Sequence, residues 1–128
     1  MTFLRTALVF TLLNLPIHAQ GKNPDASDVS AAIVPGGVAI YAMLTNPTMY
    51  DAYVQSGTSD AGKIELRDES NKVTTNLAIP AFGSTELKAG GPVVLITELK
   101  GQPKAGDTIN LKLVTDGGVA IAIAATVK

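Results

Sequence analysis

Few side chains in this sequence could bind a soft metal ion or activate a nucleophile. The 128 residues include one histidine, His18, three methionines and no cysteine, so neither a disulfide nor a thiolate metal site can form. Beyond the N-terminal segment, Met43 and Met49 are the soft donors that remain, and thioethers suit Cu(I). The competing interpretation is that Met43 fills a gap in the core and that Met49 is an ordinary loop residue.

The N-terminal segment has the three-part pattern of an export signal. Arg5 supplies a positive charge, residues 6–15 form an apolar run, and Ala19 is a small residue at the predicted cleavage site. The run is about half the ~20 residues that a membrane span needs, and a short uncleaved anchor helix is the alternative. We therefore predict cleavage after Ala19, a periplasmic or otherwise extracytoplasmic location, and no membrane span in the mature protein.

Loss of the predicted signal would also remove His18, the only imidazole in the chain. Because acid–base catalysis near neutral pH most often uses histidine, we predict that the protein is not an enzyme. The formal net charge of −1 provides no basic surface for nucleic acid. With 46% hydrophobic and 16% charged residues, the chain is expected to be an ordered globule. The predicted organisation is a signal peptide at residues 1–19, a polar leader at 20–28 and one domain at 29–128.

The elements that would position any site are short strands separated by turn residues, and no segment has a convincing helical pattern. In residues 63–67 polar and apolar residues alternate strictly, which places Ile64 and Leu66 on the core face and Glu65 and Arg67 outside. Short strands at this turn spacing favour an all-β fold, a Greek-key antiparallel β-sandwich in a single domain. The predicted strands are residues 29–34, 38–45, 50–55, 63–67, 73–79, 84–88, 93–99, 108–115 and 119–127.

The last two predicted strands form the clearest hairpin. Asp116-Gly117-Gly118 is a tight turn whose glycines can adopt positive φ. In the final strand, alanines are interleaved with the large apolar residues. These small side chains indicate that the strand is covered on both faces, and we predict that it lies inside a sheet.

Several short motifs follow one another in a distinctive order and spacing. They are Asp51-Ala52-Tyr53-Val54 and the segments 61–67, 79–81, 83–91, 99–100 and 105–111. Together they resemble the periplasmic copper chaperones of the PCu(A)C family, over residues 30–127. The resemblance implies a cupredoxin-like β-sandwich that carries Cu(I) outside the cytoplasm and delivers it to the copper subunit of a respiratory oxidase or to another copper carrier.

The resemblance also implies where a copper site would lie. The family binds Cu(I) through two histidines and two methionines, which are donors suited to this ion. Arg67 stands at the position of the first histidine, and Pro92 and Val94 stand at the positions of a later His-x-Met pair. A guanidinium stays protonated and cannot ligate, and residues 68–78 contain no methionine. The resemblance therefore predicts a degenerate metal site at Arg67, Pro92 and Val94.

Two functions remain open on this basis. The first is a copper-chaperone-like protein that binds Cu(I) weakly, through unusual donors such as Met43 and Met49, or with a partner's ligands. The second is a metal-free β-sandwich that acts as a binding or scaffold module through protein contact. In the second hypothesis the contact surface is the open end of the sandwich near Arg67, Pro92 and Val94.

Overall fold

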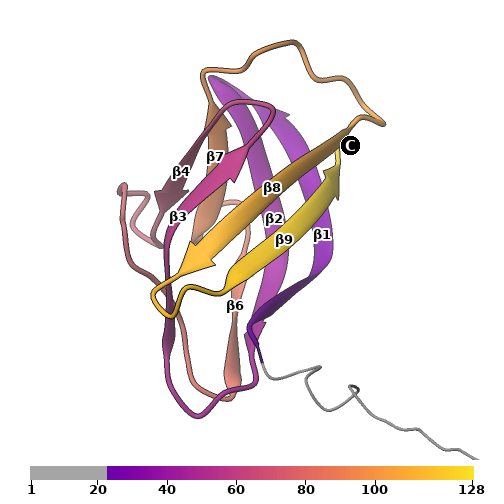
Figure 1. The fold of residues 1–128 in the computed structure, drawn as a ribbon. Helices are drawn as coiled ribbons and strands as arrows, with labels where there is room; N and C mark the ends of the chain where they lie inside the picture. The colour runs from indigo at the N-terminus through magenta and orange to yellow at the C-terminus, as the bar shows by residue number, and fades with distance from the viewer. Residues whose placement is uncertain (1–22) are drawn as a thin grey trace, which may run out of the picture.

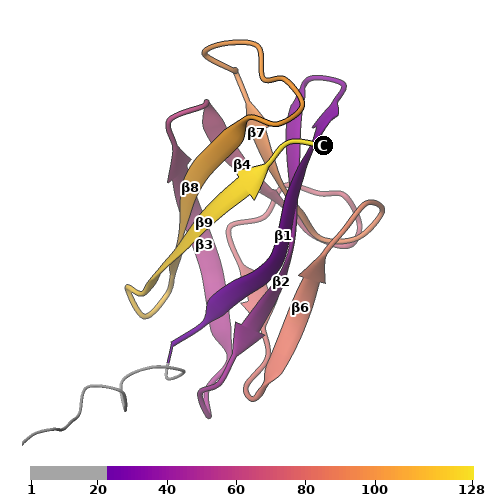
Figure 2. The same ribbon diagram turned by 90° about the vertical axis from the view of Figure 1, so that its right-hand side faces the viewer.

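The fold is a sandwich of two sheets, seen from two sides in Figures 1 and 2. The computed structural model describes residues 23–128, so the predicted signal peptide and its cleavage site lie outside the described residues. Within this range the chain forms nine strands and no helix. The strands are β1 (Asp25–Val34), β2 (Gly37–Asn46), β3 (Ala52–Ser59), β4 (Lys63–Arg67), β5 (Leu77–Ile79), β6 (Gly83–Leu87), β7 (Val93–Thr97), β8 (Thr108–Thr115) and β9 (Ala120–Thr126).

Each layer is an antiparallel sheet. In the first sheet the strand order is β1-β2-β7-β4, and β6 also pairs with β2. In the second sheet the order is β5-β3-β8-β9. The single-domain antiparallel β-sandwich predicted from the spacing of turn residues is therefore confirmed.

The core lies between the sheets and follows the predicted alternation. Ile109, Leu111 and Leu113 of β8 are buried, whereas the residues between them are exposed. Burying one aliphatic side chain of this size contributes roughly 1.5–3 kcal/mol relative to leaving it exposed. In β4, Leu66 is buried and Arg67 is half-buried on the opposite face. The inward residues thereby fix which side chains each strand presents on its outer face.

Seven of the nine strands differ in their bounds from the prediction, and one strand takes a different position in its sheet. β3 ends at Ser59, four residues beyond the predicted end. β1 begins at Asp25, inside the expected polar leader, and β5 is limited to Leu77–Ile79. The prediction that the last strand lies inside a sheet is wrong, because β9 is the final strand of its sheet. Small side chains fit an uncovered face as well as a covered one, so alanine does not specify burial. The exposed alanines of β9 are Ala120, Ala122 and Ala124.

The first sheet has a gap in its pairing on one side of β2. β6 pairs with residues 42–46 of β2, and β7 pairs with residues 38–40. The connecting segment, residues 88–92, therefore leaves the sheet beside the middle of β2. It is closed by a hydrogen bond of 2.9 Å from the Lys88 N–H to the Pro92 carbonyl. This segment leads directly into the start of β7, where the predicted site residues lie.

Gly37 begins β2 at a point where the neighbouring backbone leaves no room for a side chain. A Cβ at this position would collide with the carbonyl group of Ile96 in β7. We expect Gly37→Ala to lower the free energy of unfolding by about 2 kcal/mol or more, because the two strands must move apart. Gly117→Ala is the matched control, since a Cβ there meets no other atom. Urea unfolding of both variants measures the difference, and equal midpoints would contradict the close approach of β2 and β7.

Candidate functional site

The positions that the resemblance marks for copper ligands lie side by side where β4 meets β7. Arg67, the last residue of β4, pairs directly with Val93, the first residue of β7. Pro92 immediately precedes this pair, and Val94 pairs with Leu66. The fold thus brings Arg67 next to residues 92–95. We call this group of residues the β4–β7 mouth.

The side chains at the β4–β7 mouth divide between two faces. Residues paired across an antiparallel ladder point to the same face, whereas neighbours along one strand point to opposite faces. Val94 is fully buried in the core and points away from Arg67. Val93 and Leu95 are paired with Arg67 and Glu65 and share the outer face with them. Sequence reasoning missed Val93 and Leu95, because residues 93–96 are all apolar and the run contains no alternation of polar and apolar residues that would show which side chains face outward.

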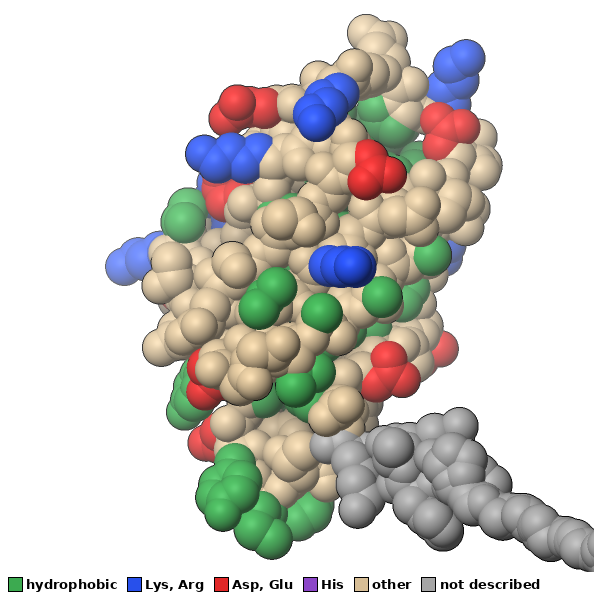
Figure 3. Space-filling model, in the orientation of Figure 1, with side chains coloured by type: hydrophobic (Ala, Val, Ile, Leu, Met, Phe, Trp, Pro, Cys, Tyr) green, Lys and Arg blue, Asp and Glu red, His purple; other side chains and the backbone are tan. Residues whose placement is uncertain are grey.

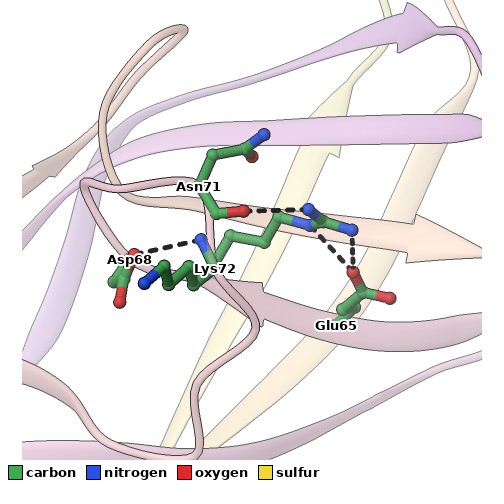
Figure 4. A network of polar contacts seen from close by, with 5 residues as sticks. Glu65, Asp68, Asn71 and Lys72 are labelled. Atoms are coloured by element: carbon green, nitrogen blue, oxygen red, sulfur yellow. Dashed lines mark hydrogen bonds and ion pairs between the residues drawn. The ribbon is translucent and has the colours of Figure 1, made fainter.

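The guanidinium of Arg67 is held by two partners at the β4–β7 mouth. Its Nε donates a hydrogen bond of 2.8 Å to Oε1 of Glu65, and its Nη2 forms an ion pair with the same oxygen. Its Nη1 donates a hydrogen bond of 3.0 Å to the carbonyl of Asn71, as Figure 4 shows. The side chains of Arg67 and Glu65 are 28% and 26% exposed, so water only partly screens the pair. The charge of Arg67 is therefore compensated, and its position is fixed.

The turn after β4 is closed by its own hydrogen bonds. Oδ1 of Asp68 accepts hydrogen bonds from the backbone N–H of Ser70 at 2.8 Å and of Lys72 at 3.1 Å. The Asp68 N–H donates to the Lys72 carbonyl at 2.9 Å. Asn71 has a φ of 63°, a left-handed conformation that asparagine tolerates. This compact turn, whose residues Asp68, Asn71 and Lys72 are labelled in Figure 4, presents the Asn71 carbonyl to Arg67.

A hollow of about 370 Å³ lies on the outer face of the first sheet, next to the β4–β7 mouth. Its floor is formed by side chains of β1, β2 and β7, and residues 88–91 and Asn71 form part of its wall. The lining is apolar apart from the Tyr41 hydroxyl, Asn71 and Lys88. Such a surface suits an apolar side chain of a partner and offers no soft donor to a metal ion. The floor residues are Val34, Ala39, Tyr41, Val93 and Leu95.

The two candidate thioether donors lie in different surroundings. Met43 is half-buried in β2 and lines a second hollow, of about 320 Å³, together with Asp28 and Glu86. Met49 lies in the loop between β2 and β3 and is 66% exposed. The hollow that Met43 lines does not include Met49.

Two further structural findings concern residues 23–128. No group of three or more His, Cys, Asp or Glu side chains in this range is arranged to hold a metal ion. This part of the chain also contains no helix with the length and apolar character needed to cross a membrane.

Residues 24–127 match the family described as "Putative lipoprotein LpqE-like". The chain belongs to the LpqE-like family. No curated protein matches this LpqE-like chain.

Several solved structures, among them the following three, are similar to this LpqE-like chain. For the copper-bound PCuAC domain from PmoF2 the TM-score is 0.70 at 13% identity, with 80% of this chain and 90% of that domain covered. For the apo PCuAC domain from PmoF1 the TM-score is 0.71 at 16% identity, with 80% and 91% covered. For the solution structure of CuI-DR1885 from Deinococcus radiodurans the TM-score is 0.67 at 25% identity, with 90% and 94% covered. The predicted resemblance to PCu(A)C domains, and the cupredoxin-like fold that it implies, are thereby confirmed.

Proposed function

We propose that this LpqE-like protein takes part in copper handling outside the cytoplasm by binding a copper protein, without itself carrying Cu(I) at the β4–β7 mouth. The lipoprotein description of the family and the apolar run at residues 6–15 support the extracytoplasmic setting. The likeness to copper-bound PCuAC and CuI-DR1885 structures supports the connection with copper. The observation that carries the proposed mechanism is the ion pair between Arg67 and Glu65.

The chemistry of the β4–β7 mouth disfavours a monovalent copper ion. Cu(I) binds thioether, imidazole and thiolate donors, and Arg67 offers none of these. Its guanidinium stays protonated, has no lone pair to offer a metal ion, and is engaged by Glu65 and the Asn71 carbonyl. Val93 and Leu95, which share its face, have hydrocarbon side chains. The β4–β7 mouth is therefore the expected position of a copper site, but its side chains offer no donor atom for Cu(I).

Protein contact is the use that these residues support best. The apolar hollow beside the mouth would receive an apolar side chain of the partner, and the fixed guanidinium of Arg67 lies next to it. The partner is the copper subunit of a respiratory oxidase or another copper carrier, the class that the PCu(A)C resemblance implies. In this role the domain is a scaffold module and not an enzyme.

Direct transport of Cu(I) through Met43 and Met49 is the second candidate function. One observation favours it: Met49 is 66% exposed, which leaves this residue accessible to a metal ion. Met43 also lines a hollow that the Glu86 carboxylate shares. This site would lie apart from the β4–β7 mouth. Its ligands would be the two thioethers, without an imidazole.

A Cu(I) titration under anaerobic conditions, with a competing chelator, separates the two candidates. We expect the exported protein to retain no copper at micromolar affinity. Copper that is retained by the wild type and lost in Met43→Leu with Met49→Leu would establish the second candidate. Copper that is retained by both proteins would contradict both assignments.

Partner contact is tested with the purified copper-binding domain of the cell's oxidase. We expect association with and without Cu(I), weakened about tenfold by Val93→Gln, because a polar amide replaces a hydrocarbon surface of the hollow. Val119→Gln, a half-buried valine in the turn before β9, is the matched control. No association, or association only with copper present, would count against the scaffold role.

A further inference from the structure

One end of the sandwich presents large apolar side chains to solvent. Residues 23–128 contain five exposed large hydrophobic residues, and three of them lie in two neighbouring loops at this end. Met49 and Tyr50, in the β2–β3 loop, are 66% and 73% exposed, and Phe82, in the β5–β6 turn, is 74% exposed. Figure 3 shows hydrophobic side chains gathered at the lower end of the molecule. We call these three residues the loop-end patch.

The β2–β3 loop is held by one buried polar side chain. Asn46 is fully buried, and its Nδ2 donates hydrogen bonds to the carbonyls of Tyr50 at 2.8 Å and Ile79 at 3.0 Å. Its Oδ1 accepts hydrogen bonds from the backbone N–H of Thr48 at 3.0 Å and from the Thr48 hydroxyl at 2.7 Å. Asn46 therefore links the loop that carries Met49 and Tyr50 to the end of β5.

The β5–β6 turn is tied to the same loop. The Phe82 N–H donates to the Thr48 carbonyl at 3.0 Å, and the Ala81 N–H donates to Oδ1 of Asp51 at 2.9 Å. Phe82 has a φ of 53°, which is uncommon for a bulky residue and costs free energy. The fold thus holds an exposed aromatic side chain on a strained backbone. Because the patch is ordered before any partner arrives, binding there loses little conformational entropy.

The charges around the loop-end patch are acidic. Asp51 lies within the β2–β3 loop, Asp25 is paired with Thr45 just before it, and Asp116 accepts a hydrogen bond from the Tyr53 N–H at 3.1 Å. Residues 45–54 and 77–85 contain no lysine or arginine. In Figure 3 the Lys and Arg side chains lie over the upper and middle parts of the visible face. Such a rim repels anionic lipid and attracts a basic protein surface.

We propose that the loop-end patch docks into a partner protein at an apolar pocket ringed by lysine and arginine. Aromatic residues and methionine are enriched in the cores of protein interfaces, where a few such anchors supply most of the affinity. The patch lies on loops separate from the β4–β7 mouth. The inference therefore does not rest on copper binding or on the proposed contact at the mouth.

Photo-cross-linking in cells that express the full chain tests this proposal first. p-Benzoylphenylalanine placed at position 82 should cross-link to a second protein, whereas the same group at Ile33, an exposed apolar residue on β1, should not. The cross-linked protein is then identified, purified and titrated against the wild type by calorimetry. No cross-link at position 82, or one only to this chain's own N-terminal segment, would overturn the proposal.

Calorimetry with the purified partner tests the residues and the charges. We expect Tyr50→Ala and Phe82→Asn each to weaken binding at least about tenfold, and Ile33→Ala to change it less than about twofold. Asn tolerates a left-handed backbone, so Phe82→Asn should fold at least as well as the wild type while binding less. The dissociation constant should rise with salt because the rim is charged. Unchanged binding by both variants would overturn the proposal.

Vesicle sedimentation tests whether the loop-end patch binds a lipid surface instead of a protein. Vesicles of phosphatidylcholine, with and without phosphatidylglycerol, should leave the exported protein in the supernatant. Sedimentation that depends on Phe82 would assign the loop-end patch to a membrane surface and overturn the protein-docking proposal. Val93→Gln, which alters the β4–β7 mouth, should leave the affinity at the loop-end patch unchanged, and this result distinguishes binding at the patch from contact at the mouth.

Discussion

Replacing Arg67 by His, Val93 by His and Leu95 by Met in one variant should raise the affinity for Cu(I) at least about a hundredfold, which corresponds to ~2.7 kcal/mol. The three side chains share the outer face at the β4–β7 mouth, and residues 67 and 93 are paired directly. Directly opposed Cβ atoms in such a pair lie about 4.5–5.5 Å apart, so two imidazoles can reach one ion. The substitution of Arg67 also releases the Glu65 carboxylate from its ion pair, and this anion favours a cation bound nearby. Chelator competition under anaerobic conditions measures the gain.

A register-shifted variant is the matched control for this experiment. Arg67→His with Pro92→His and Val94→Met adds the same donor types at the positions suggested by sequence alone. Val94 is fully buried, so its replacement puts the thioether into the core and costs about 1–3 kcal/mol of stability. We expect less than about a tenfold gain in affinity. A gain equal to that of the first variant would show that the two faces of β7 are wrongly assigned.

The strands were predictable because their local signals agree with one another. Each of the nine strands lies within or overlaps a predicted segment, and the bounds of β4 and β8 coincide with the predicted ones. In both strands polar and apolar residues alternate with period two, and turn residues stand at their ends. The pairing of β8 with β9 also followed from a local signal, the turn at residues 116–118, whereas most of the other pairings join strands that no tight turn connects and were not predicted.

The orientation of the site was less predictable because it depends on pairing between strands far apart in the sequence. That Val94 faces the core while Val93 faces Arg67 follows from the register of β7 against β4. A run of apolar residues such as 93–96 has no alternation to reveal its inward members. The ion pair of Arg67 with Glu65 joins residues on one face of one strand, and the alternation of β4 was sufficient to place them together. The contact of Arg67 with the Asn71 carbonyl depends on the turn conformation.

The role of Asn46 was also unpredictable from the sequence, because it depends on contacts between segments that are far apart in the chain. In the sequence, Asn46-Pro47 is a signal for the end of a strand, and β2 does end at Asn46. Its burial and its hydrogen bond to Ile79, which is 33 residues away, come from the packing of β5 against the end of β2. The loop-end patch was missed because Met49 was considered as a metal donor or an ordinary loop residue, and the sequence does not show that Phe82 lies in a neighbouring loop.

Asn46→Ala should lower the free energy of unfolding by about 3 kcal/mol, because it removes a buried group and leaves the Ile79 carbonyl without this donor. The Thr48 N–H also loses its acceptor, and the loop that carries Tyr50 is released from β5. Urea unfolding measures the loss of stability. Hydrogen exchange at the Phe82 N–H should accelerate more than exchange in β8, since the Thr48 carbonyl that it binds is no longer fixed.

Asn110→Ala is the matched control for Asn46→Ala, because the Asn110 side chain is exposed on β8. We expect it to change the free energy of unfolding by less than about 0.5 kcal/mol. Asn46→Ala should in addition weaken binding at the loop-end patch even where the protein remains folded, because an unfixed loop must be ordered when the partner binds. A loss of stability below about 1 kcal/mol, with unchanged exchange at Phe82, would show that backbone contacts alone hold the two loops together.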